Sequence, residues 1–164
     1  MLIGTAHTAV CVPDVEAAVE WYEQILGLKV LSPPYEMSGP AIEKDMGELI
    51  PSPVVVKAAI VGVEASDHVI EVIEYPSAPA GGEPGSRPLT DFGLTHVGLV
   101  CDNVEGTRRG LEARGVKFLT GGIANVAGLE TTWFCDPWGN VFILLGKRDP
   151  TRPYWQQYGP PPTR

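Results

Sequence analysis

The stretch AHTAVCVPDVEAAVEWYEQILGLKVL, residues 6–31, recurs later in the chain as THVGLVCDNVEGTRRGLEARGVKFL, residues 95–119. Aligning the two stretches places His7 over His96, and after one residue of slippage GLKVL falls over GVKFL. Internal repeats of this kind decide the architecture of a protein. We therefore expect two halves built on one plan.

A shorter match follows further along each half. HVIEVIEY, residues 68–75, aligns with NVFILLGK, residues 140–147, and this alignment places Glu71 over Ile143. The spacing between the two matches is longer in the first half, where the proline-rich segment 32–53 supplies the additional residues. We expect that segment to form a surface loop with a short helix at AIEKDMGEL, long enough to serve as a lid.

Each half is expected to contribute a strand, a helix and three more strands. An apolar stripe at helical spacing predicts a helix between Asp14, as N-cap, and Gly27, as its stop, and Asn103 and Gly115 have the same parts in the second half. The expected strands cover residues 3–12, 28–32, 54–62, 68–75, 94–101, 116–120, 129–135 and 140–146. The sequence predicts an α+β fold of two tandem βαβββ units, forming a half-open barrel around a pocket.

At 164 residues the chain is expected to be one domain. We divide it into a first unit (1–78), a linker (79–92), a second unit (93–147) and a tail (148–164). The tail is rich in proline and is expected to be partly disordered by default. Its aromatic residues Tyr154, Trp155 and Tyr158 favour docking on a neighbouring subunit or covering the pocket as an alternative.

The charge and the cysteines restrict the partners and the compartment. A net charge of −8, with no long basic cluster, argues against nucleic acid and anionic membranes as partners. No leader is evident, no apolar run approaches membrane-spanning length, and the three cysteines lack CxxC spacing, so we expect a cytoplasmic protein with buried, reduced thiols.

The two repeated histidines are the candidate functional residues. On an alternating strand His7 shares a face with Ala9, and His96 shares one with Gly98, so small residues leave space beside each ring. Glu71, between apolar neighbours, requires a partner if it is buried. Two imidazoles and a carboxylate suit a divalent metal. The simpler alternatives are histidines that make one ordinary hydrogen bond and a glutamate in an ion pair.

Four segments in order resemble the vicinal oxygen chelate superfamily: HTAVCVPDVEAAVEWYEQILGLKVL, HVIEVIEY, GLTHVGLVCDNVE and DPWGNVFILL. This superfamily includes glyoxalase I, methylmalonyl-CoA epimerase, extradiol dioxygenases, fosfomycin-resistance enzymes and bleomycin-binding proteins. The resemblance implies a metal pocket enclosed by the two units, with ligands at His7, Glu71 and His96. The fourth ligand position is Ile143, where many relatives have a glutamate, and an isoleucine can neither bind a metal nor carry a proton.

Three functions follow from the resemblance. The first is a lyase or isomerase that uses Zn, Ni, Co, Mn or Fe, with Glu71 as ligand, base or both, acting on a small molecule whose two neighbouring oxygens chelate the metal. The second is an Fe(II)-dependent extradiol-type dioxygenase. The third is a metal-free binding protein for a small molecule or antibiotic. The expected pocket residues are Tyr35, Trp133, Phe134 and Ile143, and we expect a homodimer.

Overall fold

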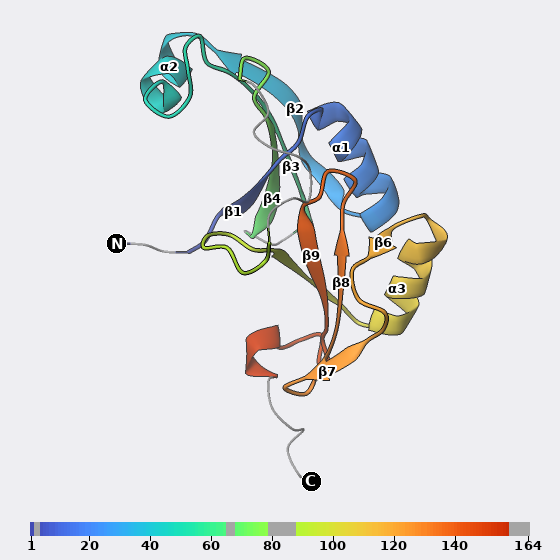
Figure 1. Cartoon of the computed structure of the whole chain (residues 1–164). Coiled ribbons are helices and arrows are strands. Elements are labelled where there is room, and N and C mark those ends of the chain that lie inside the picture. Colours follow the sequence, from blue (N-terminus) through green and yellow to red (C-terminus); the bar gives the residue numbers. More distant parts are fainter. Residues whose placement is uncertain (2–3, 65–67, 79–87, 158–164) are drawn as a thin grey trace. The chain divides into compact units, whose positions relative to one another are not determined.

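The computed structural model describes residues 1, 4–64, 68–78 and 88–157. The chain divides into two compact units, Met1–Gly82 and Glu83–Arg164, and Figure 1 shows the elements of both. Each unit is treated by itself below. That the two units together make up one domain stays a prediction.

Unit 1 contains a four-stranded sheet in the order β1-β4-β3-β2. Its elements are β1 (His7–Cys11), α1 (Val15–Trp21), a π-helical turn η1 (Tyr22–Leu26), β2 (Lys29–Ser38), α2 (Pro40–Met46), β3 (Val55–Gly62) and β4 (Val69–Glu74). The parallel β1–β4 pair begins with His7 opposite Val69, so β1 starts where its partner starts. In Figure 1, α1 lies alongside the sheet, whereas α2 follows the far end of β2.

The helix α1 begins and ends as the sequence predicts. The Asp14 carboxylate accepts a hydrogen bond from the backbone N–H of Ala17 at 2.9 Å, which satisfies a free donor of the first turn. Gly27 adopts a left-handed conformation with φ of 73° and stops the chain after η1. Between these ends, Val15, Ala18, Val19 and Tyr22 are buried, and α1 packs on β3 and β4.

The strand β2 is longer than the sequence predicts, because it runs on through Pro33 and Pro34 to Ser38. Proline cannot donate to a ladder, but β2 is an edge strand of its sheet, where a missing donor is tolerated. The pairing with β3 shifts register between Ser32 and Tyr35, which is where the two prolines lie. The first seven residues of the expected loop 32–53, residues 32–38, are therefore strand, and α2 provides the short helix that we expected.

Unit 2 contains a second sheet in the order β5-β9-β8-β6, and β7 also pairs with β8. Its elements are β5 (Val97–Cys101), α3 (Val104–Ala113), β6 (Lys117–Phe118), β7 (Ala124–Val126), β8 (Leu129–Cys135), β9 (Val141–Gly146) and a 3-10 turn η2 (Tyr154–Gln156). Asn103 caps α3 and Gly115 has a φ of 88°, so both predicted ends of this helix are confirmed.

Two features of unit 2 differ from the sequence prediction. The first strand is shorter than 94–101, because its partner β9 begins only at Val141 and the ladder starts with Val97 opposite Phe142. The strand β7 was not predicted. It forms a hairpin with β8 through Ala127 and Gly128, both at positive φ, whereas the usual sequence signal for such a turn is Asn-Gly or Asp-Gly.

The internal repeat holds at the level of hydrogen-bond register. In unit 1 Thr8 lies opposite Ile70, and in unit 2 the equivalent residues Val97 and Phe142 lie opposite each other. The strand orders also correspond, since β1, β4, β3 and β2 match β5, β9, β8 and β6. The two units therefore share one βαβββ arrangement, to which the first adds α2 and the second adds β7.

The described part of the tail, residues 148–157, is more ordered than we expected from its composition. It folds around the buried Gln157, whose side-chain amide donates to the carbonyl of Asp149 at 3.0 Å and accepts from the N–H of the same residue. Arg148 donates to the carbonyl of Gln157. Trp155 is exposed, and Tyr158 lies outside the described residues.

The cysteines are free thiols, but they are less buried than we expected. Cys11 is exposed because β1 is an edge strand and the face that Cys11 shares with His7 is open, whereas Cys101 and Cys135 are half-buried. Among the described residues, no helix has the length and apolar character needed to cross a membrane.

Candidate metal-binding site

The pairing of β1 with β4 brings His7 and Glu71 together. The register places Ala9 opposite Glu71 and His7 opposite Val69, so His7 and Glu71 project from the same face on neighbouring strands. The distance between His7 Nε2 and Glu71 Oε2 is 3.4 Å, and the two side chains are 46% and 22% exposed. The structure therefore brings these two predicted residues side by side, and their role as metal ligands stays a prediction.

The spacing of the pair fits a shared metal ion. Two nitrogen or oxygen ligands held tetrahedrally about 2.0–2.1 Å from one ion lie about 3.3 Å apart. The observed 3.4 Å is close to that separation. An imidazole nitrogen and a carboxylate oxygen are also donors that zinc and its neighbours in the first transition row accept. The pair therefore can hold two coordination positions of one divalent cation, and in the absence of a cation it forms a charge-assisted contact.

Apolar residues surround the Glu71 carboxylate on the sheet. Its two strand neighbours on the same face are Ala9 on β1 and Ile60 on β3. Neither can donate a hydrogen bond from its side chain, so His7 is the polar group that Glu71 contacts there. Further along β4, Tyr75 has a raised pKa because of burial and, secondarily, because of the Cys11 thiol and the Glu71 carboxylate. Its phenol therefore stays protonated at neutral pH.

His96 lies in unit 2, immediately before β5 rather than inside a strand. Its Nδ1 lies 2.7 Å from the hydroxyl oxygen of Thr95, and its ring meets the edge of Trp133 on β8 at a centroid distance of 4.8 Å. Thr95 engages Nδ1, so Nε2 is the nitrogen that remains for a ligand. The contact with Thr95 was not predicted from the sequence. The repeat equivalent of Thr95 in unit 1 is Ala6, which has no side-chain hydrogen-bonding group.

The fourth ligand position is apolar in the structure as well as in the sequence. Ile143 on β9 lies between Gly98 on β5 and Trp133 on β8, and it is only 9% exposed. In unit 1 the equivalent row is Ala9, Glu71 and Ile60. The same place in the two units thus holds a carboxylate in one and an alkyl group in the other.

The three expected pocket residues of unit 2 do not share one environment. Trp133 and Ile143 lie on the His96 face of unit 2, and Tyr35 is half exposed on β2 of unit 1. Phe134 is fully buried on the opposite face of β8, where its ring stacks on Phe142 at 5.2 Å. Alternation along β8 means that only one of two consecutive residues can face a ligand, so Phe134 is a core residue and is not a lining residue.

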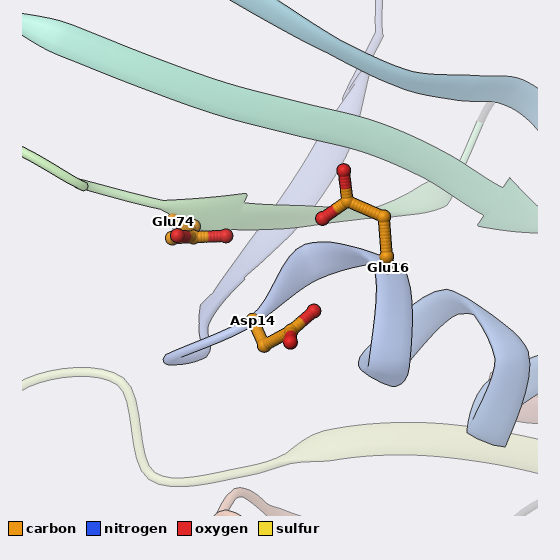
Figure 2. Close-up of side chains that lie close together, drawn as sticks. All are labelled: Asp14, Glu16 and Glu74. Atoms are coloured by element: carbon orange, nitrogen blue, oxygen red, sulfur yellow. The ribbon is translucent and has the colours of Figure 1, made fainter.

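Three carboxylates gather at the start of α1, which the sequence did not predict (Figure 2). Asp14 precedes the helix, Glu16 lies in its first turn and Glu74 ends β4. Each already has a structural partner, because Asp14 accepts from the N–H of Ala17, Glu74 accepts from the N–H of Val15 at 3.0 Å, and Glu16 pairs with Lys57 at 2.8 Å. We interpret this group as stabilising the positive end of the helix.

His68, the third histidine of the chain, contacts two threonines. Its ring nitrogens are 3.3 and 3.4 Å from the hydroxyl oxygens of Thr5 and Thr8, and the residue is exposed. Thr8 projects from the face of β1 opposite to His7. His68 therefore provides a matched control for experiments on His7 and His96.

Comparison with known proteins gives a consistent picture. Residues 4–144 match the Glyoxalase/Bleomycin resistance protein/Dioxygenase superfamily. Among solved structures, a glyoxalase family protein from Bacillus cereus superposes with a TM-score of 0.76 at 14% identity, covering 89% of this chain and 95% of that one. The antibiotic binding protein TnmS3 from Streptomyces sp. CB03234 gives 0.56 at 21% identity, covering 89% and 98%.

A glyoxalase I mutant from Zea mays gives a TM-score of 0.59 at 18% identity and covers 87% of this chain but 45% of its own. Among curated proteins, none matches this chain significantly. At these identities the solved structures establish a shared fold, and they include both enzymes and a binding protein.

Proposed function

Because the chain belongs to the Glyoxalase/Bleomycin resistance protein/Dioxygenase superfamily, we propose that it is a divalent-metal-dependent lyase or isomerase. Its substrate is a small molecule with two neighbouring oxygens. The observation that carries the proposal is the 3.4 Å contact between His7 Nε2 and Glu71 Oε2 on one open sheet face. The internal repeat supports His96 as the third ligand, since His96 is the equivalent of His7 in the second unit.

The chemistry divides between the ion and the protein. A bound Zn, Ni, Co, Mn or Fe ion supplies Lewis-acid polarisation to the two substrate oxygens. Glu71 is the residue that can accept a proton from a carbon next to those oxygens, because Ile143 has no acid or base at the equivalent place in unit 2. Ala9 and Ile60, the neighbours of Glu71 on this face, provide an apolar setting for the carboxylate.

Metal analysis of four variants tests the ligand set. We expect one ion per chain in the wild type and in His68→Ala, and an affinity lowered more than about 100-fold in His7→Ala, His96→Ala and Glu71→Gln, because even the outer partners of metal ligands contribute 10–100-fold. The measurement is elemental analysis after equilibrium dialysis against Co²⁺. An unchanged affinity in His96→Ala would show that His96 is not a ligand. An unchanged affinity in all three variants would show that the metal binds elsewhere on the protein.

Solvent isotope exchange tests the reaction. The wild type loaded with Ni²⁺, Co²⁺ or Zn²⁺ is expected to introduce deuterium from D₂O next to a carbonyl in a panel of compounds with neighbouring oxygens, and Glu71→Gln is expected to lose this exchange. Absence of exchange across the panel would contradict the proposal. Oxygen uptake on catechols after anaerobic Fe²⁺ loading would instead identify the extradiol-type dioxygenase.

The second candidate is a metal-free binding protein, favoured by the apolar surroundings of His96. Trp133 contacts the imidazole edge-on, and Ile143 lies beside Trp133 in the sheet. Such a surface suits a flat organic ligand. Under this alternative no metal co-purifies, and His7→Ala leaves ligand affinity unchanged.

The expected assembly and compartment accompany the proposal. We expect a homodimer in the cytoplasm, and the exposed Trp155 of the tail is a candidate contact between subunits. Light scattering of the full chain and of a Trp155→Ala variant measures this directly. A monomer in both would contradict the assembly without affecting the metal site.

A further inference from the structure

We infer that the molecule bound at His7 and Glu71 carries an apolar group next to its two oxygens, and that this group rests against α2. The inference rests on the proposed function and specifies its substrate class. It uses the residues of unit 1 alone, where the sheet face that holds Glu71 continues directly into the surface covered by α2.

The strand register divides this face into neighbouring rows. One row contains Ala9, Glu71 and Ile60, and the next contains Cys11, Ile73 and Ala58, extended by Tyr35 on β2. The first row holds the carboxylate of Glu71. The second row holds mainly apolar side chains. The two rows lie two residues apart along each strand, about 7 Å, so a small molecule bound at Glu71 reaches both.

The helix α2 packs on a cluster that includes Ala58 and Ile73 of the second row. Val54, Val56, Ala58 and Ile73 form a buried cluster, against which Ile42 and Met46 of α2 pack. Along β3 the side chains on this face are 1–2% exposed as far as Ala58, whereas the next one, Ile60, is only half-buried. Burial on this face of the strand therefore falls off between Ala58 and Ile60, the residue that pairs with Glu71.

The edge of this cluster is apolar and only partly buried. Met37, Ile42, Met46, Ile50 and Tyr75 all pack on the cluster while retaining exposed surface. No residue of α2 is fully buried. Contiguous apolar surface next to a polar centre is typical of a ligand site. Two of the three methionines of the chain lie here, and methionine adapts its shape to an apolar partner.

A polar clamp fixes α2 in this position. The Glu43 carboxylate accepts hydrogen bonds from the Ser52 hydroxyl at 2.6 Å and from the N–H of Val54 at 2.7 Å. These contacts tie the helix to the start of β3, the strand that carries both Ala58 and Ile60. The apolar edge is therefore held at a fixed distance from Glu71. A surface that selects ligands by size and polarity needs such a fixed position.

Two hydroxamates that differ only in their apolar part test the inference. Acetohydroxamate and benzohydroxamate present the same pair of neighbouring oxygens to a metal, and binding to the Co²⁺-loaded full-length protein is followed by visible absorption. We expect benzohydroxamate to bind about tenfold more tightly, the effect of burying a phenyl group on an apolar surface. An equal affinity for the two in the Co²⁺ protein overturns the inference and leaves the metal site intact.

Variants of α2 test whether this helix causes the preference for benzohydroxamate over acetohydroxamate. The Ile42→Ala/Met46→Ala double variant is expected to reduce the tenfold preference below threefold while acetohydroxamate affinity changes less than twofold. Met46→Gln keeps the length and helix propensity of the side chain and is expected to show the same loss in smaller degree, which provides a test if the double variant folds poorly. Leu49→Ala, at an exposed residue just after α2, is the matched control and is expected to retain the full preference.

The outcomes distinguish a failure of the inference about α2 from a failure of the proposed metal-dependent function. A preference that survives in both α2 variants overturns the role of α2. Failure of the wild type to bind Co²⁺ overturns the proposed function and, with it, the substrate class.

Discussion

The two candidate histidines have different neighbours, although the repeat makes them equivalent. His7 faces a carboxylate, whereas His96 faces a hydroxyl and an indole. A hydroxyl next to one imidazole nitrogen fixes the ring orientation and leaves the other nitrogen for a ligand. Thr95 is therefore a positioning residue for His96.

Removing the Thr95 hydroxyl is expected to weaken metal binding. In Thr95→Val the Nδ1 of His96 loses its partner at 2.7 Å, and the loss of such an outer contact lowers metal affinity by about 10–100-fold. Thr95→Ser retains the hydroxyl and should restore most of the affinity, so a competition titration with a coloured chelator checks both variants. Equal affinities for Thr95→Val and the wild type would show that the hydroxyl has no positioning role.

The sequence was sufficient to name the candidate ligands, but it did not predict which residues contact them. The sequence predicts His7, Glu71 and His96 as candidate ligands, and the structure places His7 and Glu71 on one face of neighbouring strands. The contact of His96 with Thr95 could not be predicted, since it depends on the chain leaving strand geometry before Val97. The assignment of Phe134 to the pocket was wrong because two consecutive aromatic residues cannot share one face.

At the scale of elements, α2 depends on the Glu43 clamp, which responds to pH. The hydrogen bond from Ser52 and, next, the one from the N–H of Val54 lower the pKa of the Glu43 carboxyl. A carboxyl whose pKa is lower in the folded state contributes stability above its unfolded pKa, about 4.3, and this contribution is lost as the pH falls through the folded value. The clamp is therefore intact at neutral pH and opens in acid.

We expect α2 to lose protection when the clamp is weakened. In Glu43→Gln the side chain has one accepting oxygen instead of two, so one of the bonds to Ser52 and Val54 is lost and the amides of α2 exchange faster at neutral pH. Amide hydrogen exchange followed by NMR measures this, with Glu48→Gln, an exposed residue of the same segment, as control. Equal exchange in Glu43→Gln and the control would contradict the role of the clamp.

The elements that sequence predicts well are those with local signals. Asp14 and Gly27, the caps of the first helix, are such signals, and the structure has both. The extension of β2 through Pro33 could not be predicted, because it requires knowledge that β2 is an edge strand. The hairpin at Ala127 was missed for a related reason, since the tertiary pairing of β7 with β8 holds an alanine at positive φ.

At the scale of the whole molecule, the proposed ion is expected to stabilise the folded chain. A ligand present at one hundred times its dissociation constant and bound only by the folded state adds about 2.7 kcal/mol to the free energy of unfolding. For a chain of this length, that corresponds to a rise in Tm of about 5–11 °C. Circular dichroism with and without Co²⁺ should show this rise in the wild type and in His68→Ala and should show none in His7→Ala. An equal rise in His7→Ala would place the ion elsewhere.

The matched registers of the two sheets have an evolutionary consequence. A backbone that accepts a glutamate at position 71 accepts an isoleucine at the equivalent position 143 without altering its pairing. If a βαβββ unit is duplicated, every site is present twice. Substitutions can then remove a charged residue from one copy or introduce one into the other. Chemistry can migrate from one copy to the other by a few codon changes, while the inherited scaffold stays as it was.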